Sequence, residues 1–164
     1  HMTIEENLAL AYLRTAKNQN AFFSRTSKAE KQFFRDRLAL LDMGLEDRRK
    51  QPVGLLSGGQ RQALTLLMAT LVPPKLLLLD EHTAALDPKT AEVIMALTDR
   101  VIREKHLTAM MVTHNLRYAV EYGDRILMMN RGRVVLDRAG AEKRATSMDD
   151  ILTMFNQISL ETGN

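Results

Sequence analysis

The stretch LLLLDEHTAALDPKTAEVIMAL, Leu76–Leu97, decides the fold of this chain. Its four consecutive leucines form a short apolar run, which is the pattern of a strand buried on both faces of a parallel sheet. Asp87 before Pro88 is typical of a helix N-cap followed by proline at the first helical position. We therefore predict a strand over 76–79 and a helix over 88–105. The inward face of that helix should carry Val93, Ile94, Leu97 and Val101.

A second apolar run follows this helix. Residues 108–113 are predicted to form another strand, and a strand, a helix and a strand in succession make a βαβ unit with a parallel sheet. Farther along, Asn115 should cap a short helix. Residues 125–129 and 133–137 flank a turn that is typical of a hairpin, and Ser147 with the acids after it predicts a last helix.

The residues before these strands are predicted to form helices and loops. Capping boxes at Thr3 to Glu6 and at Ser27 to Glu30 predict two helices, which should reach about residues 16 and 42. The polar segment 17–26 between them is predicted to be a loop.

A third helix is predicted over 58–71. Its apolar face should hold Ala63, Leu64, Leu67, Met68 and Leu71. The chain is thus predicted to be an α/β protein with two parts: an all-helical part over 1–72, and a part with parallel strands over 73–164.

Composition excludes several classes of protein. The 164 residues include 23 Lys and Arg against 20 Asp and Glu. These charges are interspersed, which favours a mixed solvated surface over a nucleic-acid stripe, and we expect no nucleic-acid partner. The absence of cysteine excludes disulfide frameworks and thiolate metal sites. No apolar run approaches the roughly 20 residues that span a bilayer, and no signal peptide is recognisable.

Ionisable side chains follow both predicted strands. Asp80 and Glu81 end the first strand and His114 ends the second, so a parallel sheet would bring them to one edge. One carboxylate there could hold Mg²⁺, and the other could orient or deprotonate an attacking water. Two alternatives stay open at this point: an acid pair that simply leaves a strand for solvent, and a structural histidine.

A glycine pair supplies another candidate site. Ser57, Gly58, Gly59 and Gln60 stand where the third helix begins, and free amides at a helix N-terminus favour an anion together with the helix dipole. Glycine also lets a phosphate approach the backbone closely. The alternative is an ordinary loop, in which such triplets are common. The chain contains no G-x-x-x-x-G-K-[ST] sequence, the usual phosphate-binding loop.

Taken in order, these motifs resemble the ATP-binding cassette (ABC) family, and the likeness covers essentially the whole chain. It implies that Leu56, Ser57, Gly58, Gly59 and Gln60 form the signature motif. It implies that Asp80 is the Walker B aspartate, which binds the metal, and that Glu81 is the catalytic glutamate. Ala85-Leu86-Asp87 would be the D-loop, with Asp87 as a nucleotide-binding residue like those of the signature motif. His114 would be the switch histidine, a catalytic residue like Glu81. His82 and Ala85 depart from the common pattern, in which proline and serine stand at these positions.

The resemblance also implies an arrangement. The fold would be the C-terminal half of a RecA-like P-loop NTPase core, preceded by the helical signature subdomain. In the family, two cassettes pack head to tail, and the signature of one covers the γ-phosphate of ATP held by the Walker A loop of the other. Asp80, Glu81 and His114 would serve the nucleotide on their own Walker A loop, which we expect before Thr3. ATP and Mg²⁺ are the implied cofactors, and the isolated chain is expected to be inactive.

The partners that the resemblance implies are a second ABC ATPase subunit and the subunits of a membrane permease. The intact protein would then lie in the cytoplasm, on the inner face of the cell membrane, and drive small-molecule transport. Two alternatives stay open: a cassette ATPase that acts on DNA or ribosomes, and a non-catalytic fragment that acts only as an interaction module. The sustained heptads of a long coiled coil, usual in the DNA-repair relatives, do not occur here.

One expectation concerns the sheet. In the family, the Walker A strand lies between the strand that ends at His114 and the strand near 125–129. Without it, both neighbours would carry bare edges of amides and carbonyls. We expect these strands either to close on each other or to pair with a second copy of the chain, and we favour self-association.

Overall fold

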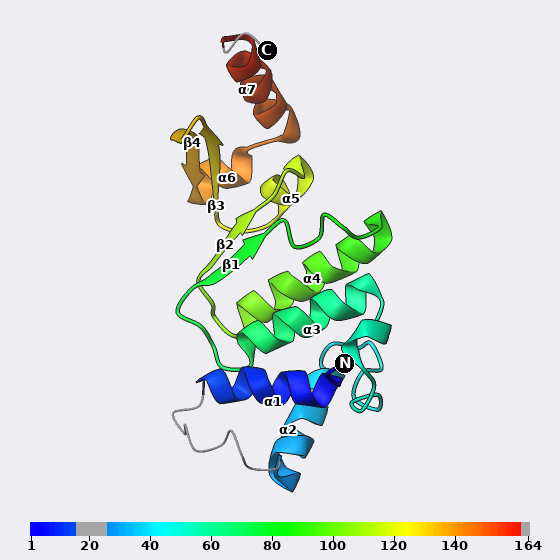
Figure 1. The fold of residues 1–164 in the computed structure, drawn as a ribbon. Helices are drawn as coiled ribbons and strands as arrows, with labels where there is room; N and C mark the ends of the chain where they lie inside the picture. Colours follow the sequence, from blue (N-terminus) through cyan, green and yellow to red (C-terminus); the bar gives the residue numbers. More distant parts are fainter. Residues whose placement is uncertain (16–25, 162–164) are drawn as a thin grey trace. The chain divides into compact units, whose positions relative to one another are not determined.

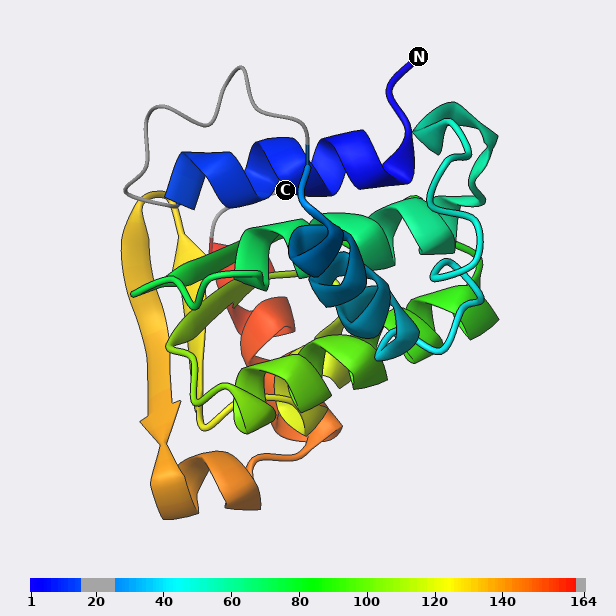
Figure 2. The same ribbon diagram turned by 90° about the horizontal axis from the view of Figure 1, so that it is seen from below.

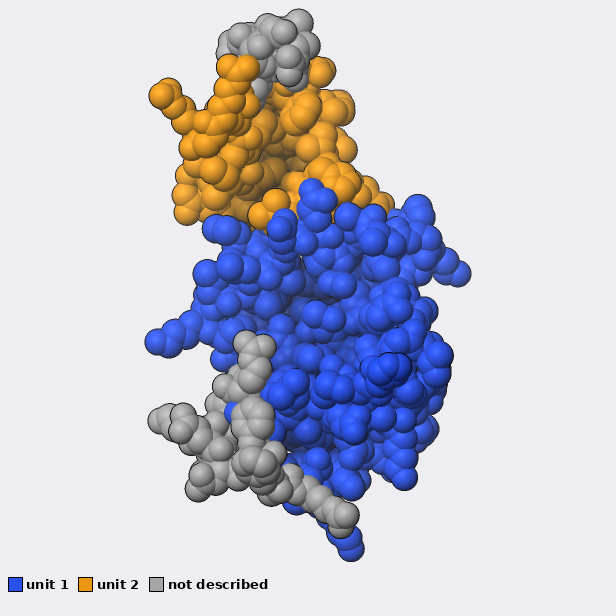
Figure 3. Space-filling model, viewed as in Figure 1, with its two compact units in different colours: residues 1–111 blue, residues 112–164 orange. Residues whose placement is uncertain are grey.

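The computed structural model describes residues 1–15 and 26–161, and it divides into two compact units, 1–111 and 112–164 (Figure 3). The loop predicted over 17–26 lies outside the described residues, apart from Thr26. The predicted boundary between a helical subdomain, 1–72, and a core part, 73–164, does not coincide with the division between these units. The units are defined by packing alone, so the subdomain boundary stays a prediction.

In the residues that the structure describes, unit 1 contains four α-helices and two short strands (Figures 1 and 2). Its elements are α1 (Ile4–Thr15), α2 (Lys28–Ala39), a 3-10 turn (Val53–Leu55), α3 (Gly58–Thr70), β1 (Leu77–Asp80), α4 (Pro88–Glu104) and β2 (Ala109–Val112), the last residue of which belongs to unit 2. The described residues before β1 are helical or irregular apart from a single bridge between Thr3 and Pro52, as the sequence predicts.

Local capping explains where the first helices begin. The Thr3 amide donates to the Glu6 carboxylate at 2.7 Å, and the Glu6 amide donates to the Thr3 hydroxyl at 3.2 Å. Ser27 and Glu30 form the same reciprocal pair at the start of α2. Both predicted capping boxes are therefore confirmed. The second helix ends at Ala39, three residues earlier than predicted, and Asp42 then adopts a left-handed φ of 54°.

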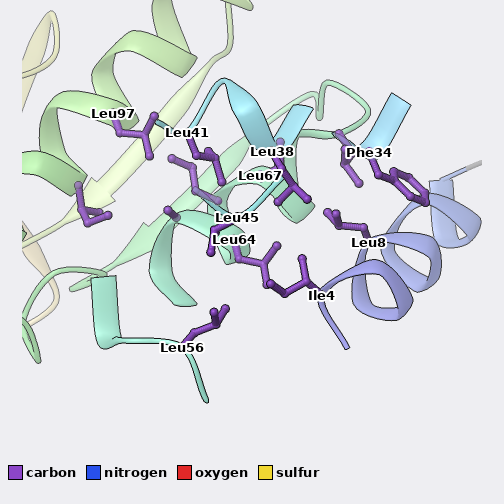
Figure 4. Close-up of a cluster of buried hydrophobic side chains, with 14 of the residues drawn as sticks. Ile4, Leu8, Phe34, Leu38, Leu41, Leu45, Leu56, Leu64, Leu67 and Leu97 are labelled. Atoms are coloured by element: carbon purple, nitrogen blue, oxygen red, sulfur yellow. The ribbon is translucent and has the colours of Figure 1, made fainter. Parts of the chain in front are cut away.

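Leucine side chains from every helix of unit 1 meet in one core (Figure 4). The predicted inner face of α3 is confirmed, since Ala63, Leu64, Leu67 and Leu71 are buried and Met68 packs against them. On α4 our prediction is wrong at one residue, and Val101 packs against the core as expected. Ile94 and Leu97 are buried as expected, but Val93 is 51% exposed and Met95 takes the inward place.

The two strands of unit 1 form a small sheet joined through α4, and they run parallel, as the predicted βαβ unit requires (Figure 1). Our expectation of burial on both faces is wrong. Leu77 and Leu79 pack into the core, whereas Leu76 is 49% and Leu78 67% exposed. The sheet is covered on the face that the helices of unit 1 pack against, so alternate leucines remain in contact with solvent.

Unit 2 contains α5 (Leu116–Glu121), β3 (Arg125–Asn130), β4 (Arg133–Ala139), α6 (Gly140–Ala145) and α7 (Met148–Glu161). The predicted hairpin is confirmed. Arg131 and Gly132 both have positive φ, 47° and 76°, which is the backbone that a tight two-residue hairpin turn requires. Asn115 caps α5 and Ser147 caps α7 as predicted. The short helix α6 has no side-chain cap, and we did not predict it.

The strands β3 and β4 pair only with each other, and β1 pairs with β2, in the part of the chain that the structure describes. Our two expected outcomes for the sheet, closure of β2 on β3 and pairing with a second copy of the chain, both stay predictions.

Candidate functional site

The N-terminus of α3 is built by the motif Ser57 to Gln60. The Ser57 hydroxyl accepts a hydrogen bond from the Gln60 amide at 3.2 Å, and the Gln60 side chain accepts one from the Ser57 amide at 3.1 Å. We expected free amides at this helix N-terminus, and the capping box engages those of Ser57 and Gln60. The Gly58 and Gly59 amides have no acceptor among the described residues. These two amides are the ones that can face an anion.

The glycine pair also seats α3 against the start of α4. A Cβ atom on Gly59 would lie 2.5 Å from Cγ2 of Thr90, and one on Gly58 would lie 3.1 Å from Cδ2 of Leu86. Gly59 is buried while Ser57 and Gly58 are exposed. The missing side chain at position 59 therefore lets two helix N-termini approach closely, and the exposed neighbours remain accessible beside that contact.

Leu56 differs from the rest of the predicted signature. Its side chain is only 4% exposed and belongs to the core cluster of unit 1. The structure thus shows a packing role for Leu56, and a nucleotide contact by this residue stays a prediction.

Asp87 caps the helix that follows the loop 81–87. Its carboxylate accepts a hydrogen bond from the Thr90 amide at 3.0 Å. The Thr90 hydroxyl, and then the Thr90 amide, hold the pKa of the Asp87 carboxyl below its usual range. Asp87 therefore remains an anion, and its local function is to fix the first turn of α4 directly beside the glycine pair.

Two exposed acids stand where β1 ends. Asp80 is the last residue of the strand, and Glu81 turns the chain with a left-handed φ of 43°. That conformation is unfavourable for a residue with a side chain, by roughly 1–2 kcal/mol. Such outliers occur where the surroundings hold the backbone in place, and they gather at functional sites.

His82 follows this turn and reaches α4. Its Nε2 lies 3.2 Å from Oγ1 of Thr98, which is itself only 1% exposed. Burial lowers the pKa of the His82 imidazole, so the ring is neutral near pH 7. Neither Thr98 nor Thr90 was among our predicted site residues. The helical spacing of Ala91, Ile94 and Thr98 places a hydroxyl on the buried face of α4, and that signal could have identified Thr98.

His114 belongs to unit 2 and lies between β2 and α5, with an exposed side chain. The next residue, Asn115, caps α5 through its side-chain oxygen, which accepts from the amides of Arg117 and Tyr118. The histidine is thus held at a helix entry by its neighbour.

No group of three or more His, Asp or Glu side chains is positioned to hold a metal ion within residues 1–15 and 26–161. Asp80 alone can still contribute to a Mg²⁺ site, because this ion keeps several waters and takes one or two carboxylates together with substrate phosphates. Over the same residues, no helix is long and apolar enough to cross a membrane.

The comparisons with known proteins agree with one another. Residues 1–84 match the family model described as ABC transporter. The tyrosine transport ATP-binding protein of Clostridioides difficile (strain R20291) is 45% identical over 154 residues, which are 94% of this chain and 60% of that protein.

Two solved structures show the same fold. An ATP-binding cassette of an ABC transporter matches with a TM-score of 0.74 and 22% identity, over 98% of this chain and 63% of that one. A dimeric bacterial ABC transporter cassette matches with a TM-score of 0.66 and 27% identity, over 84% of this chain and 56% of that one.

The chain therefore belongs to the ABC transporter family, and the predicted class, an α/β cassette core with parallel strands and a helical part, is confirmed. It spans 60% of the length of the curated relative described above.

Proposed function

We propose that this chain is part of the ATP-binding and ATP-hydrolysing subunit of an ABC transporter. The observation that carries the proposal is the N-terminus of α3, where the Gly58 and Gly59 amides are unengaged and Gly59 seats the helix against α4. Two adjacent helix N-termini with exposed serine and glycine form a surface suited to phosphate. Residues 1–72 would be the helical subdomain and 73–164 the C-terminal part of the core.

Each site residue has a proposed role. Ser57, Gly58, Gly59 and Gln60 would bind the γ-phosphate of ATP held by a second subunit, with Leu56 anchoring the motif in the core. Glu81 would orient or deprotonate the attacking water, and His114 would contact the same nucleotide. Asp87 would support the signature face through its cap on α4.

Asp80 is the proposed ligand of Mg²⁺. The residue is exposed at the end of a strand and is followed by the turn at Glu81, so its carboxylate fits a site completed by phosphate oxygens and water. A Mg²⁺ ion bound there supplies positive charge to the phosphate oxygens. The protein's own contribution is to keep Asp80 and Glu81 in place.

The proposed partners are a second ATPase subunit, packed head to tail, and the subunits of a membrane permease. The dimeric bacterial cassette supports the first partner, and the description of the Clostridioides difficile relative as a transport ATP-binding protein supports the second. The permease would hold the ATPase at the inner face of the cell membrane. A cassette ATPase that acts on DNA or ribosomes is the competing function, which copurification with ribosomes or DNA in place of permease would favour.

The isolated 164-residue chain should not hydrolyse ATP. Phosphoryl transfer depends almost entirely on positioning and charge, and this sequence contains no G-x-x-x-x-G-K-[ST] loop to hold the β- and γ-phosphates. Steady release of phosphate by the purified chain, abolished in Glu81→Gln, would contradict this.

Two variants test the proposal in a protein that contains this chain together with a Walker A loop. Glu81→Gln should stop hydrolysis, retain ATP binding and accumulate a closed dimer, because it removes the base and leaves the phosphate contacts. Ser57→Arg should instead prevent the closed dimer, because it places bulk and charge in the shared interface. Loss of nucleotide affinity in Glu81→Gln as severe as that in Asp80→Ala would show that the roles of the two acids are wrongly divided.

A further inference from the structure

We propose that His82 is a positioning residue for Glu81. Its hydrogen bond to Thr98 fastens the left-handed turn at Glu81 to α4 and so fixes the direction in which the Glu81 carboxylate leaves the sheet. The inference rests on the proposed function, since Glu81 acts on water only in an ATPase.

The backbone at Glu81 needs support. Its φ of 43° lies in a region that residues with a Cβ rarely adopt. Such a conformation persists only when neighbouring contacts determine the path of the chain. On one side, β1 fixes Asp80 through its pairing with β2. On the other side, the residue that directly follows Glu81 makes a contact with α4.

His82 supplies that contact with a defined donor and acceptor. The Thr98 hydroxyl donates its single proton to the Ile94 carbonyl at 2.7 Å, so its oxygen is left to accept. The His82 ring must therefore carry a proton on Nε2 and donate it to Thr98, 3.2 Å away. Because Thr98 is buried in the middle of α4, the ring is tied to a rigid part of unit 1.

The loop 81–87 is fastened to α4 at both ends. Asp87 caps the first turn of the helix, and His82 bonds to a residue farther along it. Between these anchors, the Ala84 amide donates to the Glu81 carbonyl at 2.9 Å and the Leu86 amide to the Thr83 carbonyl at 3.1 Å. Loss of the His82 bond would free the Glu81 end of the loop while the Asp87 end stays capped.

This arrangement predicts a specific kinetic effect. A misplaced carboxylate lowers the rate of the chemical step, whereas contacts that bind ATP are elsewhere and unchanged. Weakening the anchor should therefore lower kcat and leave the KM for ATP nearly constant.

The test uses the ATPase that contains this chain together with its Walker A loop. Thr98→Val removes the acceptor at nearly constant volume, and we expect kcat to fall about tenfold, less than the ~100-fold that a misplacement of 1 Å can cost. Thr98→Ser keeps the hydroxyl and should restore most of the activity. Thr70→Val is the matched control, because Thr70 is also buried and its hydroxyl also donates to a carbonyl four residues earlier, Leu66, at 2.8 Å. It should leave kcat within about twofold of the wild type.

Two further variants separate the anchor from general loss of packing. His82→Ala should lower kcat as much as Thr98→Val, and the double variant should be no worse than either, because both changes remove one interaction. In the 164-residue chain, nitrogen NMR of the His82 ring should show a proton on Nε2 whose signal persists in Thr98→Ser and shifts in Thr98→Val.

The results that overturn the inference are distinct from those that overturn the proposed function. Additive losses in the double variant, an equal loss in Thr70→Val, or a raised KM with unchanged kcat would each refute the role of His82 in a working ATPase. A wild-type protein that binds no ATP or hydrolyses none would refute the proposed function itself, and with it the task assigned to His82.

Discussion

Replacing Gly59 with alanine tests the seating of α3 on α4. The new Cβ would lie 2.5 Å from Cγ2 of Thr90, whereas carbon atoms in contact prefer about 3.5–4.0 Å. The two helix N-termini, or the Thr90 side chain, must therefore move by about 1 Å. The neighbouring Gly58 offers a contrast, because its Cβ would lie 3.1 Å from a terminal methyl of Leu86, which can rotate away.

The size of the effect follows from two opposed contributions. Overpacking in a closely packed region costs about 1–3 kcal/mol, and a helical alanine regains about 0.5–1 kcal/mol relative to glycine. We therefore expect Gly59→Ala to lower the free energy of unfolding by about 1–2 kcal/mol, or the melting temperature by about 2–8 °C in a chain of this size. Gly58→Ala should be neutral or slightly stabilising.

Thermal unfolding of the 164-residue chain, followed by far-ultraviolet circular dichroism, measures both variants. Thr90→Ser provides the rescue, because it removes Cγ2 and keeps the hydroxyl that bonds to Asp87. The combination Gly59→Ala with Thr90→Ser should be more stable than Gly59→Ala in the Thr90 background. Equal effects at the two glycines, or no rescue by Thr90→Ser, would refute the close contact.

Two other parts of unit 1 give further predictions. Lys105→Met should lower the free energy of unfolding by about 1 kcal/mol, because the Lys105 ammonium donates to the Thr70 carbonyl at the end of α3. Lys75 is exposed, so the control variant Lys75→Met should change this free energy little. Urea unfolding measures both variants. The Ser27 amide, and then the Ser27 hydroxyl, lower the pKa of the Glu30 carboxyl. The contribution of this cap to the free energy of unfolding is therefore fully present above the ordinary carboxyl pKa of about 4.3, and it is lost as the pH falls through the lower pKa of the folded state. Unfolding midpoints should accordingly fall in acid, and Glu30→Gln should make that fall shallower; an unchanged slope would contradict the assigned cause.

Local signals made the helix starts predictable. Thr3 with Glu6 and Ser27 with Glu30 specify their own capping bonds within three residues, and Asp87 with Pro88 does the same for α4. These interactions need no knowledge of the tertiary structure, which is why the sequence alone locates them.

Properties that depend on packing were harder to predict. The four leucines from Leu76 predict a strand that is buried on both faces of the sheet. Which of these side chains are buried depends, however, on the elements that pack against each face. The face of α4 was misjudged by one residue, since Val93 and Met95 are both apolar and periodicity alone cannot choose between them. The short α6 begins without a side-chain cap and leaves no sequence signal.

In the candidate site, too, local features were predictable from the sequence and contacts that depend on packing were not. The motif residues were found from their order in the chain, but their partners were not. The bond between His82 and Thr98 joins residues 16 positions apart, and the contact between Gly59 and Thr90 joins residues on different helices. Both depend on the geometry of packed elements, so only a structure identifies them.

Mixed dimers test the central claim, that the Ser57 motif of one subunit serves the ATP bound by another, most directly. The protein is a complete ATPase that contains this chain, with Ser57→Ala in one subunit and Glu81→Gln in its partner. If the motif acts across the dimer, both lesions fall in one site and the second site stays intact, so hydrolysis persists. Placing both changes in one subunit beside a wild-type partner then damages both sites, and hydrolysis is lost. The reverse pattern, activity only when both changes share a subunit, would contradict the claim.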